Sequence, residues 1–295
     1  MTNPEPSTAP RLGFQNGFTV LMAVYQKDDV VLFERAVHSV YANTLTPDAF
    51  VLVVDGPVPQ ALDAAIRSLQ ACYAIEVLPL PANVGLARAL NAGLKRVRTT
   101  WVARADADDY NVPDRFALQA AAVARSDDLV DIVGGAIQEV EPGGRALAVR
   151  RTAERHAEIR RYAAYRSPFN HMTVAYRTEL ALRCGGYPDI HLKEDYALWA
   201  QMLASGARAL NLPDVLVLAT AGRDMYRRRG GRRYALAEIT LQKHLVHVGL
   251  KSRPMALIHG LGRASVFLLP AAVRGWIYEK VLRAPIADER RRVSC

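Results

Sequence analysis

Short, continuously apolar runs alternate along the first half of the chain with segments in which apolar residues recur every three or four positions. The runs predict buried strands, and the periodic segments predict helices with one apolar face. The predicted strands cover residues 18–24, 50–54, 74–80 and 101–105, and the predicted helices cover residues 31–41, 62–69 and 85–97. Because such strands alternate with helices, we expect an α/β fold with a mostly parallel central sheet covered by helices on both faces.

The second half of the chain continues this alternation less regularly. Apolar spacing predicts helices over residues 117–124, 150–162, 179–183 and 196–204, the first of them entered through Pro113. Further strands are predicted over residues 131–137, 171–176 and 215–219, with a hairpin turn at residues 141–144. Two apolar patches of helical spacing follow, at residues 255–261 and 264–273.

These patterns divide the chain into three parts. Residues 1–16 are polar and rich in proline, and we expect them to be a disordered tail without the apolar core of a signal peptide. Residues 17–221 are the predicted sheet domain, and residues 222–295 are a basic helical C-terminal extension. The 3 cysteines are odd in number and lack C-x-x-C spacing, which argues against a disulfide framework or a zinc site. This cysteine usage favours a reducing, cytoplasmic compartment.

The positive charge of the chain is concentrated near its end. Of the net charge of +9, residues 223–295 carry 16 Lys or Arg against 5 Asp or Glu, whereas the remainder carries 22 against 24. A basic segment attached to a near-neutral domain indicates an anionic partner, either nucleic acid or a lipid surface. The apolar patches fall short of the ~20 residues that span a bilayer. We therefore expect interfacial helices on an anionic membrane, the alternative being helices that pack on the domain.

Three carboxylates directly follow the predicted strand that begins at Trp101, namely Asp106, Asp108 and Asp109. In an extended chain Asp106 and Asp108 point the same way, and two like charges side by side repel each other unless a cation lies between them. A hard divalent ion with oxygen ligands, Mg²⁺ or Mn²⁺, is the expected occupant. The alternative is a solvated acidic turn, because Asp is an ordinary turn residue.

Polar residues follow the other predicted strands in the same way. Tyr25 to Asp28 follow the first strand and Asp55 follows the second. Because parallel sheets bind ligands beyond the carboxyl ends of their strands, we expect these groups and the three carboxylates to line one crevice. The chain contains neither G-x-G-x-x-G nor a P-loop, so a phosphate ligand there needs a metal ion.

Three stretches stand out in this order: TVLMAVYQKDD with VLVVDG, then NVGLARALNAGL with RADADDYNVPDRF, then NHMTVAYR with GGY and KEDYALWAQML. Together they resemble the family-2 glycosyltransferases, which have a GT-A fold. The resemblance covers residues 18–220, about two-thirds of the chain. The segments NHMTVAYR, LPDVLVLA and MYRRRGG look closer still to bacterial exopolysaccharide transferases of the amylovoran-biosynthesis type.

The resemblance implies an inverting, metal-dependent transfer of a hexose from a nucleotide-sugar, in particular a UDP-sugar, to a hydroxyl of a lipid-linked saccharide or glycan. It implies that Asp195 is the general base and that Glu194 shapes the acceptor pocket. Asp108 would hold the metal, Asp106 would contact the ribose or a metal-bound water, and Asp109 would tie down the loop. The remaining donor contacts would come from Ala23, Val24, Tyr25, Asp55, Asn83, Gly85 and Arg88.

The sequence departs from the family pattern at two places. Ala23 stands where the family usually has Pro, and Asp55 is followed by Gly-Pro-Val-Pro without the second acidic residue that often contacts ribose. His171 is a candidate third contact to the metal or diphosphate, the alternative being a histidine packed at a strand start. Arg227 and Arg228, with Arg229, either close over the diphosphate or form a solvated basic loop. Trp199 is expected in the core rather than at an acceptor platform.

Two other functions fit parts of the sequence. A sugar-1-phosphate nucleotidyltransferase also combines an α/β sheet with paired carboxylates, but its Gly-rich phosphate loop near the first strand is missing. A nucleic-acid-binding protein would explain the basic extension. The extension interleaves Arg with Leu, Val and Ile more than with stackable aromatics and contains no nucleic-acid motif, so we expect no nucleic-acid partner.

Overall fold

The computed structural model describes residues 14–126, 129–141, 143–220 and 230–268. The chain divides into two compact units, which are described separately. The first unit contains residues up to Asp189 and the segment Glu194–Ala221, and the second contains Ile190–Lys193 and the chain from Gly222 onward. Arg227, Arg228 and Arg229 lie outside the described residues.

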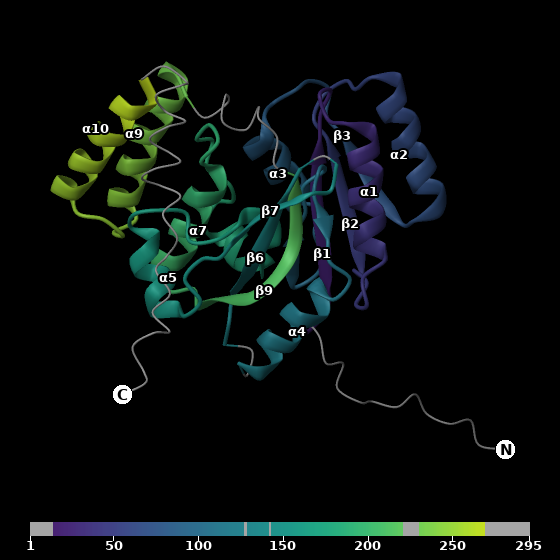
Figure 1. Ribbon diagram of the computed structural model, residues 1–295, viewed down its shortest axis with the longest axis horizontal. Helices are drawn as coiled ribbons and strands as arrows, with labels where there is room; N and C mark the ends of the chain where they lie inside the picture. The colour runs from purple at the N-terminus through teal and green to yellow at the C-terminus, as the bar shows by residue number, and fades with distance from the viewer. Residues whose placement is uncertain (1–13, 127–128, 142, 221–229, 269–295) are drawn as a thin grey trace. The chain divides into compact units, whose positions relative to one another are not determined.

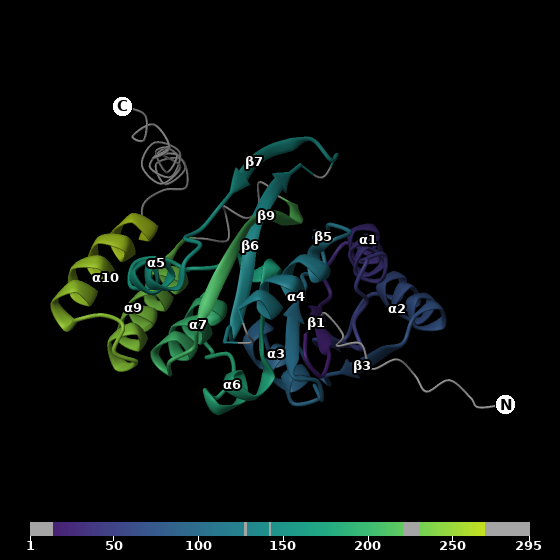
Figure 2. The same ribbon diagram turned by 90° about the horizontal axis from the view of Figure 1, so that it is seen from below.

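The first unit is built on one mixed sheet with the strand order β3-β2-β1-β4-β8-β6-β9-β5, to which β7 adds beside β6 (Figures 1 and 2). The strands β3, β2, β1 and β4 are mutually parallel, as are β6 and β9, whereas β8, β5 and β7 pair antiparallel. The strands are β1 (Phe18–Val24), β2 (Ala49–Val54), β3 (Ile75–Pro79), β4 (Trp101–Arg104), β5 (Tyr110–Asn111), β6 (Ile132–Val140), β7 (Ala146–Arg150), β8 (Ala175–Arg177) and β9 (Ala209–Thr220).

Helices pack on both faces of this sheet, which confirms the predicted α/β fold (Figure 1). They are α1 (Val30–Tyr41), α2 (Gln60–Cys72), α3 (Leu86–Leu94), α4 (Arg115–Arg125), α5 (His156–Ala163), α6 (Thr178–Arg183) and α7 (Glu194–Ala204), with a 3-10 turn, η1 (His171–Thr173).

Alternate residues of the central strands decide which helix covers which face, because strand side chains point to the two faces in turn. Val20 and Met22 of β1 lie in the core that α1, α2 and α4 supply, together with Phe116. The intervening residue Leu21 faces α3 on the other side of the sheet. There a Cβ on Gly93 would lie 2.5 Å from the Leu21 side chain, so only glycine allows this close approach.

Several elements differ from the sequence-based expectation. The strand β4 ends at Arg104, so residues 106–109 form a turn, and strand alternation does not orient the carboxylates. The segment predicted as a strand over 171–176 begins as η1 and enters β8 only at Ala175. The predicted helix over 150–162 begins at His156, because residues 146–150 pair with β6. The expected disorder through residue 16 is wrong at Phe14, which is buried and contacts the Phe18 and Trp101 rings.

The second unit contains two packed helices, α9 (Arg232–His247) and α10 (Arg253–Leu268). The two apolar patches predicted in the extension fall largely on α10, which is one continuous helix. Within the described residues, none of the helices combines the length and apolar character needed to cross a membrane.

Candidate functional site

A tight turn after β4 brings three carboxylates together. Asp106, Asp108 and Asp109 each offer an oxygen, and these atoms all lie within 4.8 Å of one another. The turn is fixed to the end of β9, because the Thr220 backbone N–H donates to Asp109 Oδ1 at 2.9 Å and the Thr220 hydroxyl donates to the Asp108 carbonyl at 2.6 Å. Asp109 therefore ties down the loop and also belongs to the cluster.

The Asp106 carboxylate lies between two cationic side chains. Arg104 Nη2 approaches Asp106 Oδ1 at 2.8 Å, as an ion pair whose angles do not make a hydrogen bond, and His171 Nε2 lies 2.9 Å from Oδ2. Burial opposes the ionisation of Asp106, but the charges of Arg104 and His171 outweigh burial and hold the pKa of Asp106 well below its usual range. Asp106 is thus a carboxylate with its charge already balanced.

The neighbouring carboxylates crowd each other. Burial, followed by the charges of Asp108 and Asp106, raises the pKa of Asp109 well above its usual range. Two carboxylates that crowd each other in this way ionise together only when a cation lies between them. Their hard oxygen donors fit Mg²⁺ or Mn²⁺, so the residues present suit the predicted metal.

His171 connects the carboxylate cluster to the predicted general base. Its Nδ1 lies 3.8 Å from Asp195 Oδ2, while its Nε2 faces Asp106. Burial disfavours the imidazolium, but the charges of Asp106 and Asp195 outweigh burial and raise the pKa of His171 to about 9. In this arrangement His171 lies between two carboxylates. Its predicted metal contact stays a prediction.

The N-terminus of α7 carries the two remaining acidic residues. Glu194 is buried, and burial followed by the charge of Asp195 raises the pKa of Glu194 to about 7. Asp195 Oδ1 is buried and accepts no hydrogen bond from the described residues, while Oδ2 faces His171. A buried oxygen without a donor is uncommon in proteins, and it marks Asp195 as a residue whose role is not structural alone. Further along α7, Trp199 is fully buried against the Tyr176 ring, as expected of a core residue.

The predicted donor contacts gather at the carboxyl ends of β1 and β2. Ala23 and Val24 pair in parallel with Val53 and Val54, and the Asp55 N–H donates to the Val24 carbonyl at 2.8 Å. This register places Tyr25 and Asp55 after neighbouring strands, at the same edge of the sheet as the carboxylate turn.

Asp55 organises the loop that leads into α3. Its two carboxylate oxygens accept the backbone N–H groups of Val84 at 2.7 Å and Gly85 at 3.0 Å, and the Asn83 amide donates to its carbonyl. Gly85 has φ +88°, a conformation that glycine adopts without strain. Arg88, one turn into α3, pairs with Asp189 at 2.8 Å. The structure thus places Asn83 and Gly85 beside Asp55 and pairs Arg88 with Asp189, while Arg227 and Arg228 fall outside the described residues.

Sequence reasoning missed Arg104, although it is the closest cation to Asp106. The signal was present: Arg104 ends an otherwise apolar strand and immediately precedes the acidic turn. A buried charge of this kind is rare without a partner. Arg115, also fully buried, donates to the Arg104 carbonyl at 2.7 Å and so supports the same strand end.

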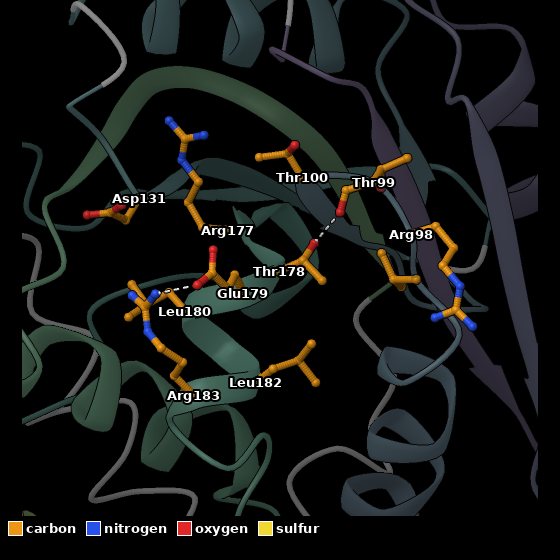
Figure 3. A pocket seen from close by; sticks show the side chains of 11 residues that line it. Arg98, Thr99, Thr100, Asp131, Arg177, Thr178, Glu179, Leu180, Leu182 and Arg183 are labelled. Atoms are coloured by element: carbon orange, nitrogen blue, oxygen red, sulfur yellow. Dashed lines mark hydrogen bonds and ion pairs between the residues drawn. The ribbon is translucent and has the colours of Figure 1, made fainter.

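A separate cavity of about 370 Å³ lies at the start of β4, the opposite end of that strand from the carboxylates (Figure 3). Thr99, Thr100 and Thr178 line it, and Thr178 donates to the Thr99 carbonyl at 2.8 Å. Arg183 is paired with Glu179 along its lower wall in this view. None of the predicted site residues lines this cavity.

Comparisons with known proteins agree with this geometry. The model of the family described as Glycosyl transferase family 2 matches residues 19–187. A UDP-Gal:alpha-D-GlcNAc-diphosphoundecaprenol beta-1,3-galactosyltransferase of Escherichia coli is 37% identical over 268 residues, which cover 90% of this chain and 96% of that protein. The amylovoran biosynthesis glycosyltransferase AmsE of Erwinia amylovora is 33% identical over 263 residues, covering 89% of this chain and 98% of that protein.

Among solved structures, Staphylococcus aureus TarS in complex with UDP-GlcNAc matches with a TM-score of 0.61 at 18% sequence identity. The match covers 90% of this chain and 73% of that one. A likeness at this identity shows the fold alone, and that fold is the predicted GT-A type.

Proposed function

The chain belongs to the family-2 glycosyltransferases, and from this premise we propose that it transfers a hexose from a UDP-sugar to a hydroxyl of a lipid-linked or polysaccharide acceptor. The Escherichia coli relative is named for UDP-galactose and for an acceptor on diphosphoundecaprenol, which supports both substrate classes. The predicted likeness to exopolysaccharide transferases is confirmed by the identity with AmsE. Family membership also sets aside the alternative of a nucleotidyltransferase.

One observation carries the proposal: a carboxylate cluster and a separate carboxylate on α7 are joined by a single histidine. Asp106 and Asp195 both face His171, from opposite ring nitrogens. This arrangement separates the two tasks that glycosyl transfer needs, which are holding the donor diphosphate and removing a proton from the acceptor.

In the proposed mechanism a divalent ion, when bound, neutralises the negative charge of the departing diphosphate. Asp108 and Asp109 would hold that ion, with Asp106 beside them. The Asp195 carboxylate accepts the proton of the acceptor hydroxyl as that hydroxyl attacks the anomeric carbon. His171 lies beside Asp195, and Glu194 borders the acceptor. A single in-line displacement with one base inverts the anomeric centre.

The proposed donor pocket uses the loop that Asp55 organises. Tyr25 follows β1 beside it, and Asn83, Gly85 and Arg88 stand at the start of α3. Because both Asp55 oxygens already accept backbone N–H groups, a base N–H would add a further hydrogen bond to a carboxylate that has lone pairs to spare. Asp55 therefore both shapes the pocket and remains able to contact the base.

We also propose that the second unit rests on an anionic membrane surface, where a lipid-linked acceptor would be found, and that the enzyme is cytoplasmic and peripheral to the inner membrane. Leu257, Ile258 and Leu261 of α10 are 60% to 68% exposed and, by helical spacing, share one side of the helix. An apolar helix face beside basic residues is the feature that binds interfaces of this kind.

The donor half of the proposal is tested by Asp108→Asn, which keeps the size of the side chain and removes its charge. We expect Mn²⁺-dependent UDP binding, measured by calorimetry, to weaken by about tenfold or more, as loss of a metal ligand should. Chelation of the metal should weaken UDP binding by the wild-type protein in the same way. The control is Asp114→Asn, an exposed carboxylate in the same segment. If Asp108→Asn bound UDP as tightly as the wild type, Asp108 would not be a ligand of the metal.

A further inference from the structure

Lys193, the residue immediately before the two acidic residues of α7, is held by a buried carboxylate in the helical extension. Its Nζ lies 2.9 Å from Glu238 Oε2 on α9, and it also sits 4.5 Å from the centre of the Tyr234 ring. Glu238 is fully buried, and the Lys193 side chain is only 12% exposed. A pair this buried breaks only at considerable cost, because each charge would lose a partner where water cannot replace it.

Glu238 is the centre of a network that joins α9 to α10. Arg263 Nη1 lies 3.3 Å from Glu238 Oε1, and the Gln242 amide donates to the same oxygen at 2.8 Å. Lys251 in turn donates to Gln242 at 2.7 Å. Burial opposes the ionisation of Glu238, but the charges of Lys193 and Arg263 outweigh it and lower the pKa of Glu238. Lys193 is thus bound by a rigid, charged anchor.

The backbone at this point is strained. Leu192 has φ +56°, a conformation that is uncommon for a bulky residue, and its side chain is 40% exposed. The Lys193 N–H donates to the Ile190 carbonyl at 2.8 Å, which closes a tight turn. Strained residues persist only where their surroundings hold them. An exposed leucine does not hold itself by packing, so the buried Lys193 side chain supplies the restraint.

From these contacts we infer that Lys193 and Glu238 are positioning residues for the general base: their ion pair fixes the turn at residues 190–193, which continues along the chain directly into Glu194 and Asp195. The inference rests on the proposed role of Asp195. Two residues of chain span at most about 7 Å, so the Lys193 anchor has little slack before it reaches Asp195. A displacement near 1 Å at a reacting group can cost about 10²-fold in rate. The extension then serves catalysis as well as location.

The test is Lys193→Met, which keeps an unbranched side chain of similar length and removes the charge. We expect kcat to fall by about tenfold while the Kd for UDP with Mn²⁺ stays within about twofold. The Kd should hold because the proposed donor site is formed at the ends of β1, β2 and β4 and not by the turn that contains Lys193. Backbone amides of residues 190–196 should exchange hydrogen faster. Lys193→Arg, which retains a cation for Glu238, should restore most of kcat.

The matched control is Lys251→Met, which loosens the same network and leaves the Lys193 contact intact. It should lower the melting temperature of the extension without lowering kcat or speeding exchange over residues 190–196. An equal loss of kcat in both variants would overturn the inference, as would wild-type kcat with wild-type exchange in Lys193→Met. If Lys193→Met does not fold, the double variant Lys193→Met/Glu238→Gln removes the uncompensated charge and is measured in the same way.

The two proposals fail in different ways. If Asp195→Asn kept its turnover, Asp195 would not be the base, yet amide exchange over residues 190–196 would still report whether Lys193 holds the turn. If exchange were unchanged in Lys193→Met while Asp195→Asn lost turnover, the base would stand and the positioning role would be wrong.

Discussion

At the scale of single residues, the carboxylates of the site differ in the charges that surround them. Asp106 has Arg104 and His171 as partners, and its pKa is lowered accordingly. Asp109 is buried beside two other carboxylates, and its pKa is raised. Arg104 and His171 thus balance the charge of Asp106, and the oxygen donors of the cluster suit a divalent cation. This division explains why adjacent carboxylates in one turn serve different roles.

Asp195 is the residue whose loss should separate binding from turnover. We expect Asp195→Asn to fold, to bind UDP with Mn²⁺ normally, and to lose turnover by about 10²-fold or more, because an amide cannot accept the acceptor's proton. Initial rates at saturating donor, alongside calorimetry, measure both quantities. Asp63→Asn, at an exposed pair on α2, is the control and should leave both unchanged. Turnover close to wild type in Asp195→Asn would place the base elsewhere.

At the scale of elements, the apolar pattern predicted the bounds of a helix or strand well where the element packs on others that lie close to it in the sequence. The strands β1 and β2 and the helix α1 match the predicted ranges within one residue at each end, because their apolar spacing reflects burial on one sheet. Their carboxyl ends then place Tyr25 and Asp55 together, as the sequence predicted.

The pattern failed where pairing is decided by distant strands. The segment 171–176 includes the strand-forming residues Thr173, Val174 and Tyr176, yet residues 171–173 form a 3-10 turn, because only Ala175–Arg177 finds partners in β4 and β6. That turn is what points His171 at Asp106, so the bridge between the two halves of the site could not be read from spacing. The ion pair between Lys193 and Glu238 joins residues 45 positions apart. It could not be predicted from local spacing either, because its partners are distant in the sequence.

Arg115 shows how an element beneath the site depends on buried polar contacts. It begins α4 with no exposed surface and donates to the Arg104 carbonyl at 2.7 Å and to the Asn111 side chain. Arg115→Met would leave both acceptors buried without a donor, and we expect unfolding free energy to drop by about 2–4 kcal/mol. Urea denaturation measures this difference. Arg67→Met, at an exposed pair, should change stability by less than about 1 kcal/mol; equal effects would contradict the role of burial.

At the scale of the whole molecule, charge and apolar surface are separated in sequence. The positive excess lies beyond residue 223, and the same region contains the exposed apolar side of α10. In the proposed function the sheet unit supplies the chemistry, and the extension supplies both a candidate membrane surface and Glu238, the partner of Lys193.

The apolar side of α10 is tested by the triple variant Leu257→Ser/Ile258→Ser/Leu261→Ser. We expect it to reduce co-sedimentation with liposomes containing anionic lipid by about tenfold or more, because each buried apolar side chain contributes roughly 1.5–3 kcal/mol. Added salt should weaken liposome binding by the wild-type protein as well, because salt screens the attraction between the basic residues and the anionic lipid. The control is Leu147→Ser/Val149→Ser on β7, which removes apolar side chains that are 41% to 42% exposed from the sheet unit and should leave sedimentation unchanged. Equal binding by the triple variant and the wild type would mean that α10 does not enter the lipid, and the basic residues alone would then have to account for any membrane association.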